Sequence, residues 1–316
     1  AGSVAMKHLI ERCEQLNVRT RFDHRVISLV KDSADNIVGV SAVSFGEQMY
    51  IRARGGVIIS AGGFSFNPDM VANYAPQLPS SAVALGIPNN DGDAIGLGIS
   101  SGAALSAMNG VIATASFYPP GKLIKGIVVN RSGRRFVNED AYHGRTADFL
   151  MGQADASAFL ILDAETFEYS ENPELNNNLI DGWETIEDME AALKLPAGSL
   201  VDTLNEYNRF ASDGEDPLFH KNNKWVQPLD KPPYAAFDIS YDKLSYMFLT
   251  LGGVKADCEA QVINQHGTPI SGLYAAGACV PTVPQDGKGY ASGLSLGPGS
   301  YYGRIAGRNA ASAIQN

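Results

Sequence analysis

Hydroxyl side chains stand out in one glycine-rich loop of the chain. The loop from Val280 to Leu296 contains Tyr290 and Ser292, and its single cation is Lys288. Phenol and hydroxyl groups can polarise a carbonyl or pass on a proton, but they cannot neutralise a charged ligand. Burying a dicarboxylate without paired cations is costly. We therefore expect this loop to face a neutral, apolar molecule.

A second tyrosine, Tyr142, follows the segment Arg135-Phe-Val-Asn-Glu139, and His143 stands beside it. Ordinary structure would also explain these residues. Tyr142 could cap a hairpin over residues 126–138, Ser292 before a glycine is common in turns, and His143 is more typical of a surface position than of a base. The other histidines have no spacing that indicates a metal site, so we expect no metal; they are His8, His24, His220 and His266.

Three glycine-rich segments could bring backbone close to a nucleotide cofactor. Two of them, residues 60–63 and 272–277, end apolar strands, and the third, residues 292–299, opens a helix. Missing side chains allow close approach, and a helix N-terminus offers free N–H groups and positive potential to an anion. Each segment alone would also suit a simple turn. The three together favour a cofactor.

The elements that must position these residues follow from apolar periodicity. Spacing predicts helices over residues 6–16, 94–104 and 298–314, and a β-branched core strand leading into Gly62. Alternation predicts a short strand over residues 18–22 and three strands over residues 26–31, 37–45 and 48–53. Further strands are expected near residues 246–251 and 261–264.

The stretch from residue 154 to residue 230 differs in character, with Asn-rich turns and acidic helices. We interpret it as part of a cap inserted into the core, with a cleft between the two. The fold class is then α/β, a Rossmann-like core with an inserted α+β cap domain. The predicted parts are residues 1–105 and 246–316 for the core and residues 106–245 for the cap.

Composition excludes several classes of function. The 316 residues have a formal net charge of −10 and no Lys/Arg run, so we expect no nucleic-acid partner. No apolar run is long enough to span a bilayer, and the N-terminus lacks a signal pattern. The three cysteines are scattered, which is typical of reduced thiols. These features predict a cytoplasmic protein without an integral membrane segment.

Together the motifs resemble the FAD-containing family of fumarate reductases, succinate dehydrogenase flavoprotein subunits and 3-ketosteroid dehydrogenases. The family's Ala-Thr-Gly-Gly-Phe is similar to residues 60–64, and its Gly-Leu-Tyr-Ala-Ala-Gly-Glu to residues 272–278. Its Thr-Gly-Asp-Gly loop resembles residues 91–94, and its final Ser-Gly-x-Ser-Leu and Gly-Arg-x-Ala-Gly resemble residues 292–296 and 303–307. The resemblance covers nearly the whole chain and is weakest in the cap.

The resemblance implies FAD as the cofactor and a set of residues that hold it. The chain departs from the family pattern where Ala278 replaces a glutamate and Ala94 a glycine, and the opening Gly-x-Gly-x-x-Gly motif is absent. Residue 1 is therefore expected to fall within a domain, which leaves the core incomplete at its N-terminus. The implied cofactor-binding residues are Val26, Ala61, Gly62, Gly63, Asp93, Gly277, Ala278, Ser295 and Leu296.

Within this family the substrate pattern resembles the 3-ketosteroid dehydrogenases. The segment Phe248-Leu-Thr-Leu-Gly-Gly253 lacks the histidine of fumarate reductases, and Tyr290-Ala-Ser292 looks more like the Δ4-(5α) enzymes than the Δ1 enzymes. The resemblance implies that Tyr290, with a backbone N–H near Gly293, holds the 3-keto oxygen. Tyr142 and Ser292 would then accept the proton as a C4–C5 double bond forms, with hydride passing to flavin N5.

Two other interpretations stay open. One keeps the scaffold but changes the reaction, to Δ1-dehydrogenation or to reduction of another enone or a fumarate-type acid. The other is a truncated, non-catalytic remnant that binds an apolar ligand. The sequence does not identify the electron acceptor of a steroid-oxidising enzyme.

Overall fold

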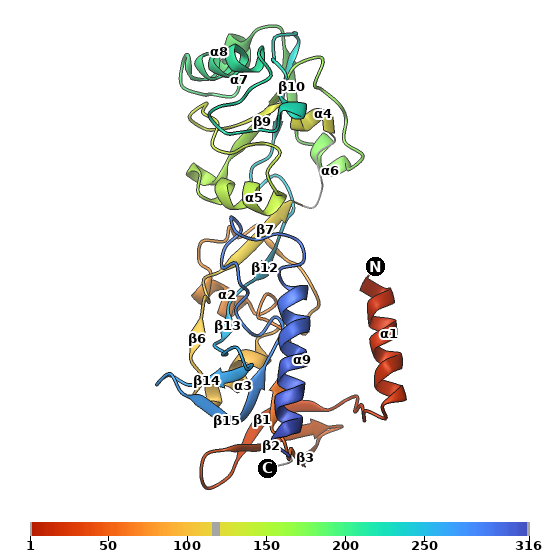
Figure 1. Ribbon diagram of the computed structural model, residues 1–316. Coiled ribbons are helices and arrows are strands. Elements are labelled where there is room, and N and C mark those ends of the chain that lie inside the picture. Colours follow the sequence, from red (N-terminus) through yellow and green to blue (C-terminus); the bar gives the residue numbers. More distant parts are fainter. Residues whose placement is uncertain (1, 116–120, 315–316) are drawn as a thin grey trace.

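The computed structural model describes residues 2–115 and 121–314. An upper lobe, residues 121–241, lies above a lower lobe formed by the residues before and after it (Figure 1). Helices and strands are mixed throughout, which confirms the predicted α/β class. The finer division into a Rossmann-like core and a cap stays a prediction.

The centre of the lower lobe is a three-stranded sheet of order β14-β15-β4. β4 (Val57–Ile59) runs parallel to β15 (Pro269–Ala275), and β14 (Gln261–Ile263) is antiparallel to β15. Alternate side chains of β15 pack in two different hydrophobic cores, because successive side chains of a strand point to opposite faces of the sheet. Leu273 and Ala275 pack with Ala94 of α3 (Asp93–Ser101), whereas Tyr274 packs with Ile305 of α9 (Leu296–Ser312). A helix therefore covers each face, and both parallel strands end in glycines at the same edge.

A meander of order β1-β2-β3 lies at the foot of the lower lobe. β1 (Arg25–Lys31), β2 (Ile37–Ser44) and β3 (Glu47–Arg52) pair antiparallel, which confirms the three strands predicted there. The strand predicted over residues 18–22 is wrong, because these residues pair with no other strand and are exposed. Alternation without a partner or a buried face does not make a strand.

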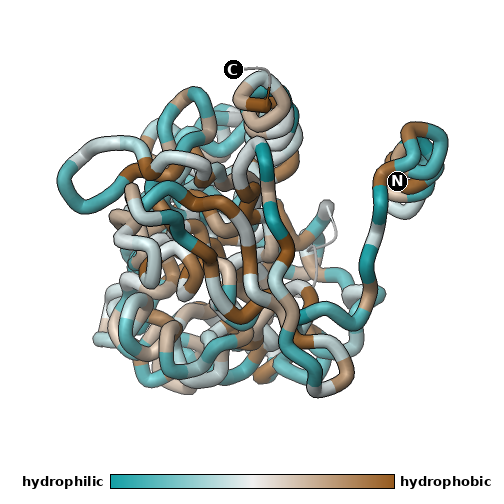
Figure 2. Tube along the Cα trace, turned by 90° about the horizontal axis from the view of Figure 1, so that it is seen from below, coloured by the Kyte–Doolittle hydropathy of each residue, from teal (hydrophilic) through white to brown (hydrophobic). Residues whose placement is uncertain are grey.

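Helix α1 (Gly2–Gln15) stands apart from the lower lobe in both views (Figures 1 and 2). The predicted helix is confirmed, but none of its residues is buried, and Leu9 is 60% exposed. Its amphipathic pattern therefore does not correspond to a face packed in this structure.

Two paired strands join the lobes (Figure 1). β7 (Val111–Ala115) pairs antiparallel with β12 (Tyr246–Thr250), from Tyr246 opposite Ala115 to Thr250 opposite Val111. At its lower end the backbone N–H of Thr250 donates to Ser65 Oγ, at 3.2 Å. At its upper end the Tyr246 hydroxyl donates to the carbonyl of Ile239, at 2.7 Å. Each end of β12 is thus fixed in a different lobe.

The upper lobe contains a four-stranded antiparallel sheet of order β10-β11-β9-β8. β9 (Ala158–Leu162) is buried along its whole length. On one face of the sheet, Leu160 and Leu162 pack in a core that includes residues of α5 (His143–Met151). On the other face, Phe159 and Ile161 pack in the core under α7 (Ile186–Ala192) and α8 (Ser199–Ala211). The other strands are β8 (Ile127–Asn130), β10 (Leu179–Trp183) and β11 (Tyr234–Asp238).

The hairpin predicted over residues 126–138 forms only in part. β8 leads into a turn, but the returning chain makes one bridge, Val129 to Arg135, and no second strand. The side chain of Arg135 lies instead in a buried ion cluster, and the chain leaves the sheet there.

The remaining elements are short: α2 (Pro68–Tyr74), α4 (Gly121–Ile124), α6 (Pro173–Asn176), β5 (Val83–Ala84), β6 (Leu105–Ser106) and β13 (Gly253–Val254).

Candidate active site

Tyr142 meets the glycine-rich loop at the junction of the lobes. It is the N-cap residue of α5, with φ −54° and ψ 130°, and its side chain does not cap the helix. Its hydroxyl lies 3.0 Å from Ser292 Oγ, across 150 positions of sequence. The structure therefore brings together the two residues expected to handle a proton. The alternative in which Tyr142 caps a hairpin does not apply, because the residue begins a helix.

Tyr290 faces the same point from the loop between β15 and α9. Its ring centroid is 6.5 Å from that of Tyr142, and its hydroxyl lies 2.9 Å from Ser295 Oγ. The hydroxyl groups of Tyr142, Ser292, Tyr290 and Ser295 thus form two adjacent pairs. Both pairs are solvent-accessible, so a ligand can reach them.

Helix α9 begins without a side-chain cap. Ser295 is the N-cap residue, yet its hydroxyl makes no cap hydrogen bond and turns to Tyr290 instead. A serine at this position ordinarily accepts from the backbone N–H of the second or third helical residue. Gly293 precedes it with φ +97°, a conformation that favours glycine, and nothing lies within 4 Å of its Cβ position. In the first turn the N–H of Gly297 donates to the carbonyl of Gly293, at 2.8 Å, and Pro298 has no N–H, so Leu296 is the helical residue there that can offer a backbone N–H to a ligand.

His143 packs behind Tyr142 and not at the tip of a hairpin. Its ring centroid is 4.1 Å from that of Tyr142, and its Nδ1 hydrogen-bonds with Thr114 Oγ1. Burial lowers the pKa of His143 below its usual value, because desolvation disfavours the imidazolium. His143 is thus half-buried at the start of α5 and not at the end of a hairpin, and its ring is neutral at neutral pH.

A buried ion cluster anchors the segment that precedes Tyr142. Arg135 donates to both oxygens of Glu139 and of Asp216, at 2.8 to 3.0 Å, and Lys221 Nζ lies 3.2 Å from Glu139 Oε2. All four side chains are at most 4% exposed. Burial alone would lower the pKa of Arg135, but the carboxylates of Glu139 and Asp216 raise it well above its usual value. The cluster is neutral overall and fixes the backbone three residues before Tyr142.

The glycine-rich strand ends converge in the lower lobe. The carbonyl of Gly63 accepts from the N–H of Gly92, at 3.1 Å, and a Cβ on Gly63 would lie 3.1 Å from the carbonyl oxygen of Ala278. Gly62 has φ +89°, and a Cβ there would collide with the side chain of Asn90. A side chain at Gly63 would therefore press on the backbone of Ala278, and the positive φ of Gly62 favours glycine.

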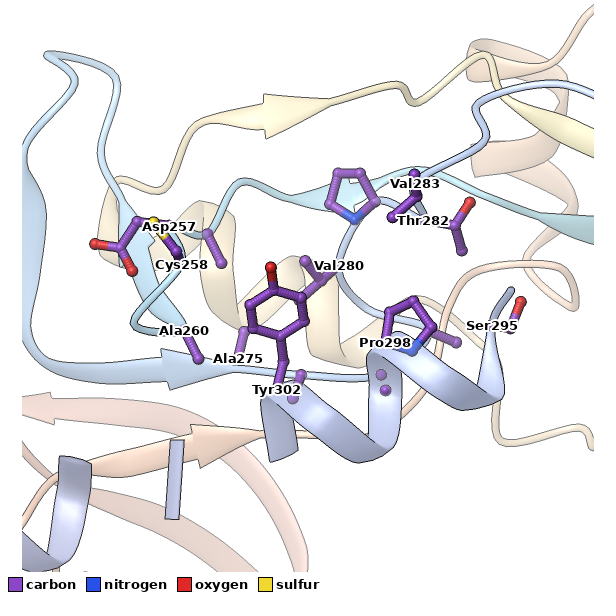
Figure 3. A pocket seen from close by; sticks show the side chains of 16 residues that line it. Asp257, Cys258, Ala260, Ala275, Val280, Thr282, Val283, Ser295, Pro298 and Tyr302 are labelled. Carbon is purple, nitrogen blue, oxygen red and sulfur yellow. The ribbon is translucent and has the colours of Figure 1, made fainter. Parts of the chain in front are cut away.

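A cavity of about 350 Å³ lies between the end of β15 and the start of α9 (Figure 3). Gly277, Ala278 and Ser295 line it, and Figure 3 places Ser295 and Pro298 on one wall opposite Val280 and Thr282. Gly277 has φ +89°, and a Cβ on Gly299 would lie 3.5 Å from the Gly277 Cα. The wall is thus built of small residues beside an uncapped helix N-terminus.

The other residues expected at the cofactor lie outside this cavity. Val26 and Asp93 line a separate depression, in which the Asp93 carboxylate accepts from Arg25 Nη2 and Nε, at 2.6 and 3.1 Å. Ala61 is exposed at the end of β4, and Leu296 is 76% exposed on the first turn of α9. Of the nine predicted cofactor residues, Gly277, Ala278 and Ser295 share the cavity of Figure 3.

Two residues of α5 hold the loop and were not singled out from the sequence. Arg145 donates through Nε and Nη2 to the carbonyl of Lys288, at 3.2 and 3.1 Å. Asp148 Oδ1 accepts from the N–H of Gly287, at 3.3 Å, and Asp148 Oδ2 lies 3.7 Å from Lys288 Nζ. Their spacing of three residues on one helix face was the available signal, since such residues are neighbours on a helix surface.

The residues around the cavity fit a flavin nucleotide. Small residues and positive-φ glycines give room for close approach, and the N–H of Leu296 at the start of α9 can donate to an electron-rich oxygen. Within residues 2–115 and 121–314, no group of three or more His, Cys, Asp or Glu side chains could hold a metal ion. No helix in the same ranges has the length and apolar character needed to cross a membrane.

Solved structures of two steroid dehydrogenases are similar to this chain. The 3-ketosteroid-Δ4-(5α)-dehydrogenase of Rhodococcus jostii RHA1, in complex with 4-androstene-3,17-dione, is 38% identical with a TM-score of 0.89; the match covers 97% of this chain and 63% of that one. The 3-ketosteroid Δ1-dehydrogenase of Sterolibacterium denitrificans, in complex with 1,4-androstadiene-3,17-dione, is 26% identical with a TM-score of 0.73, over 95% of this chain and 61% of that one.

Curated relatives include a protein with a different substrate. NADH:acrylate oxidoreductase of Vibrio harveyi is 27% identical over 97% of this chain, which spans 32% of that protein's length. The predicted resemblance to fumarate reductase and steroid dehydrogenase flavoproteins is confirmed. Since the family model described as FAD binding domain matches residues 1–293, the chain belongs to that family of flavoproteins, and FAD is its cofactor.

Proposed function

We propose that this protein is a flavin-dependent dehydrogenase that introduces the C4–C5 double bond of a 3-ketosteroid. The observation that carries the proposal is the 3.0 Å contact between the Tyr142 hydroxyl and Ser292 Oγ, beside Tyr290. The 38% identity to a 3-ketosteroid-Δ4-(5α)-dehydrogenase supports the same reaction.

Tyr290 holds the substrate's 3-keto oxygen in this proposal. As the α-proton leaves, negative charge develops on that oxygen, and a preorganised hydroxyl stabilises it. The Tyr290 hydroxyl is oriented by Ser295 Oγ, at 2.9 Å, and the open backbone at Gly293 supplies a second donor. Donors of this kind contribute typically about 3 kcal/mol each to lowering the barrier.

Tyr142 and Ser292 form the proton acceptor. A free tyrosine has a pKa of about 10, so its phenol must pass its own proton on as it takes the substrate's α-proton. Ser292 lies within hydrogen-bond distance to receive it and is exposed to solvent. The C4–H bond breaks as the proton moves to this pair, and its electrons form the C4–C5 double bond as the β-hydrogen departs with its own electron pair.

Gly277, Ala278 and Ser295 would hold FAD at the cavity of Figure 3. Bound FAD supplies the two-electron acceptor for the hydride from the β-carbon. Gly63 adjoins Ala278, and we propose that Gly63 and its neighbours Ala61 and Gly62 keep backbone close to the same cofactor. Val26, Asp93 and Leu296 stay predictions for parts of FAD beyond this cavity.

The two lobes correspond in this proposal to a Rossmann-like FAD-binding core and an inserted cap. The cap, residues 106–245, supplies Tyr142, and the core, residues 1–105 and 246–316, supplies Tyr290 and Ser292. A site built from both sides of a domain junction is common for small-molecule enzymes.

The charge around the loop favours a ketone over a carboxylate substrate. Lys288 is the one cation between Val280 and Leu296, and Asp148 already lies 3.7 Å from it. An acrylate- or fumarate-like anion would therefore lack a free cation in this loop.

The proposal is tested by mixing the FAD-loaded protein, without oxygen, with the 5α-saturated counterpart of 4-androstene-3,17-dione. We expect the visible band of oxidised flavin to bleach and 4-androstene-3,17-dione to form. A C1–C2 olefin would identify a Δ1 enzyme. If the steroid does not bleach the flavin, whereas acrylate or fumarate reoxidises the reduced flavin, the steroid assignment is overturned.

Matched variants connect the reaction to the site. Tyr142→Phe and Ser292→Ala should each slow bleaching by about 10²- to 10⁴-fold, the range for loss of a general acid or base. Tyr50→Phe, which removes a hydroxyl from an exposed residue of β3, should leave the rate unchanged.

A further inference from the structure

The loop that carries Tyr290 and Ser292 touches α5 at a second place. Tyr142 begins α5, and Arg145 and Asp148 lie one and two turns further along the same nine-residue helix. They contact the loop at Gly287 and Lys288, a few residues before Ser292. The Tyr142–Ser292 pair and the contacts of Arg145 and Asp148 therefore connect the same helix to the same loop.

The Arg145 guanidinium donates two hydrogen bonds to a single backbone carbonyl oxygen. Its Nε and Nη2 both donate to the Lys288 oxygen, at 3.2 and 3.1 Å. Hydrogen bonds from a guanidinium are stronger than neutral ones, and the planar fork fixes direction as well as distance. Arg145 thus limits both the position and the orientation of the loop backbone.

Asp148 holds the loop through backbone and side chain at once. Its side chain is 14% exposed, Oδ1 accepts from the Gly287 N–H at 3.3 Å, and Oδ2 lies 3.7 Å from Lys288 Nζ. The Lys288 ammonium also lies 5.1 Å from the centre of the Phe149 ring. Burial raises the pKa of Asp148, and Lys288 and the Gly287 N–H oppose that rise. The carboxylate therefore depends on the loop for its partners.

Gly287 allows the loop to lie directly on the helix. It is buried, and a Cβ there would come within 2.8 Å of the Gly144 carbonyl oxygen and 2.9 Å of the Asp148 Cβ. Neither atom belongs to a flexible side-chain end, so a methyl group would displace the loop. Gly289, two residues on, is exposed, and its Cβ would meet nothing closer than 3.5 Å.

We propose that Arg145 and Asp148 are positioning residues, which seat residues 284–292 on α5 at Gly287 and thereby set Ser292 at hydrogen-bond distance from Tyr142. They act through the loop and touch neither the substrate nor FAD. The effect on turnover rests on the proposed function, whereas the effect on the loop does not.

The first test compares Gly287→Ala with its matched control Gly289→Ala. Hydrogen–deuterium exchange of the peptide covering residues 284–294 should be faster in Gly287→Ala, in Arg145→Ala and in Asp148→Ala than in the unaltered protein, and unchanged in Gly289→Ala. This measurement needs no substrate. Equal exchange in the two glycine variants would overturn the proposal even if steroid is not the substrate.

Turnover supplies the second test. In the FAD-loaded protein Gly287→Ala should lower kcat by about 10- to 100-fold, the effect expected when reacting groups are displaced by about 1 Å, with little change in KM. In a Ser292→Ala background the same substitution should have almost no further effect, because residues that act as a unit are not additive. The same factor in both backgrounds would assign the contact a purely structural role.

Discussion

The hydroxyl of Tyr290 lies 2.9 Å from the hydroxyl of Ser295, the residue at which helix α9 begins. The Ser295 side chain makes no cap bond to its own helix, so its hydroxyl is available to orient the proposed carbonyl-binding phenol. The same residue lines the cavity of Figure 3.

We expect Ser295→Ala to lower kcat by about 5- to 10-fold, because one net hydrogen bond that orients Tyr290 is lost. Ser295→Thr keeps the hydroxyl and should restore most of the rate. Ser300→Ala is the control: it removes a hydroxyl that donates to the Leu296 carbonyl on the same helix. Steady-state turnover of the saturated ketone is the measurement, and equal losses at positions 295 and 300 would contradict the expected role of Ser295.

Tyr142 and Ser292 should behave as one unit. If the proton passes from the first to the second, the double variant Tyr142→Phe/Ser292→Ala should be about as slow as the slower single variant. The measurement is the anaerobic single-turnover rate of flavin bleaching in the unaltered protein, the two single variants and the double variant. If the two single-variant rate losses multiply in the double variant, the two hydroxyls, although 3.0 Å apart, act in separate steps.

His143 makes stability depend on pH. Its pKa is lowered by burial in the folded protein, so between that value and the unfolded pKa of about 6.5 the unfolded chain binds more protons. Its contribution to stability is therefore complete above about pH 6.5 and is lost as the pH falls. Urea unfolding gives the free energy of unfolding at about pH 5.5 and at about pH 7.5. The difference between these two free energies should be smaller for His143→Gln than for the unaltered protein. His266→Gln, at an exposed turn, should leave the difference unaltered.

Arg135→Met should destabilise the fold by about 3 to 5 kcal/mol, because Asp216 would lose its ion-pair partner and Glu139 would keep only Lys221 in a buried site. Chemical denaturation followed by circular dichroism measures the loss. Arg209→Met removes an exposed arginine from α8 and should change stability by no more than about 0.5 kcal/mol. A similar small change at Arg135 would show that the cluster relaxes without it.

Much of the lower lobe could be predicted from local pattern. The two parallel strands ending in glycine, the meander after Arg25 and the final helix each have a periodic or turn signal of their own. The proximity of Tyr142 to Ser292 followed from motif resemblance, since nothing in the spacing of residues 150 positions apart indicates a contact.

The upper sheet could not be predicted in the same way. β9 and β11 are short and almost fully buried, so they lack the alternation that marks a half-exposed strand. The contacts of Arg145 and Asp148 escaped prediction because they depend on how the loop folds over α5. Ser295 was expected at the cofactor, and its contact with Tyr290 escaped prediction for a related reason: a serine before a helix usually caps it, and only the structure shows it turned toward Tyr290.

The pairing of β7 with β12 limits how far the lobes can shift along each other. Five residue pairs, from Tyr246–Ala115 to Thr250–Val111, form its ladder, and β5 pairs with β12 at Met247 and Phe248. Sliding one strand along the other would break several hydrogen bonds at once and move side chains to the opposite face. The strand register therefore acts as a ruler between the lobes, which keeps the Tyr142 side of the site at a set height above Ser292.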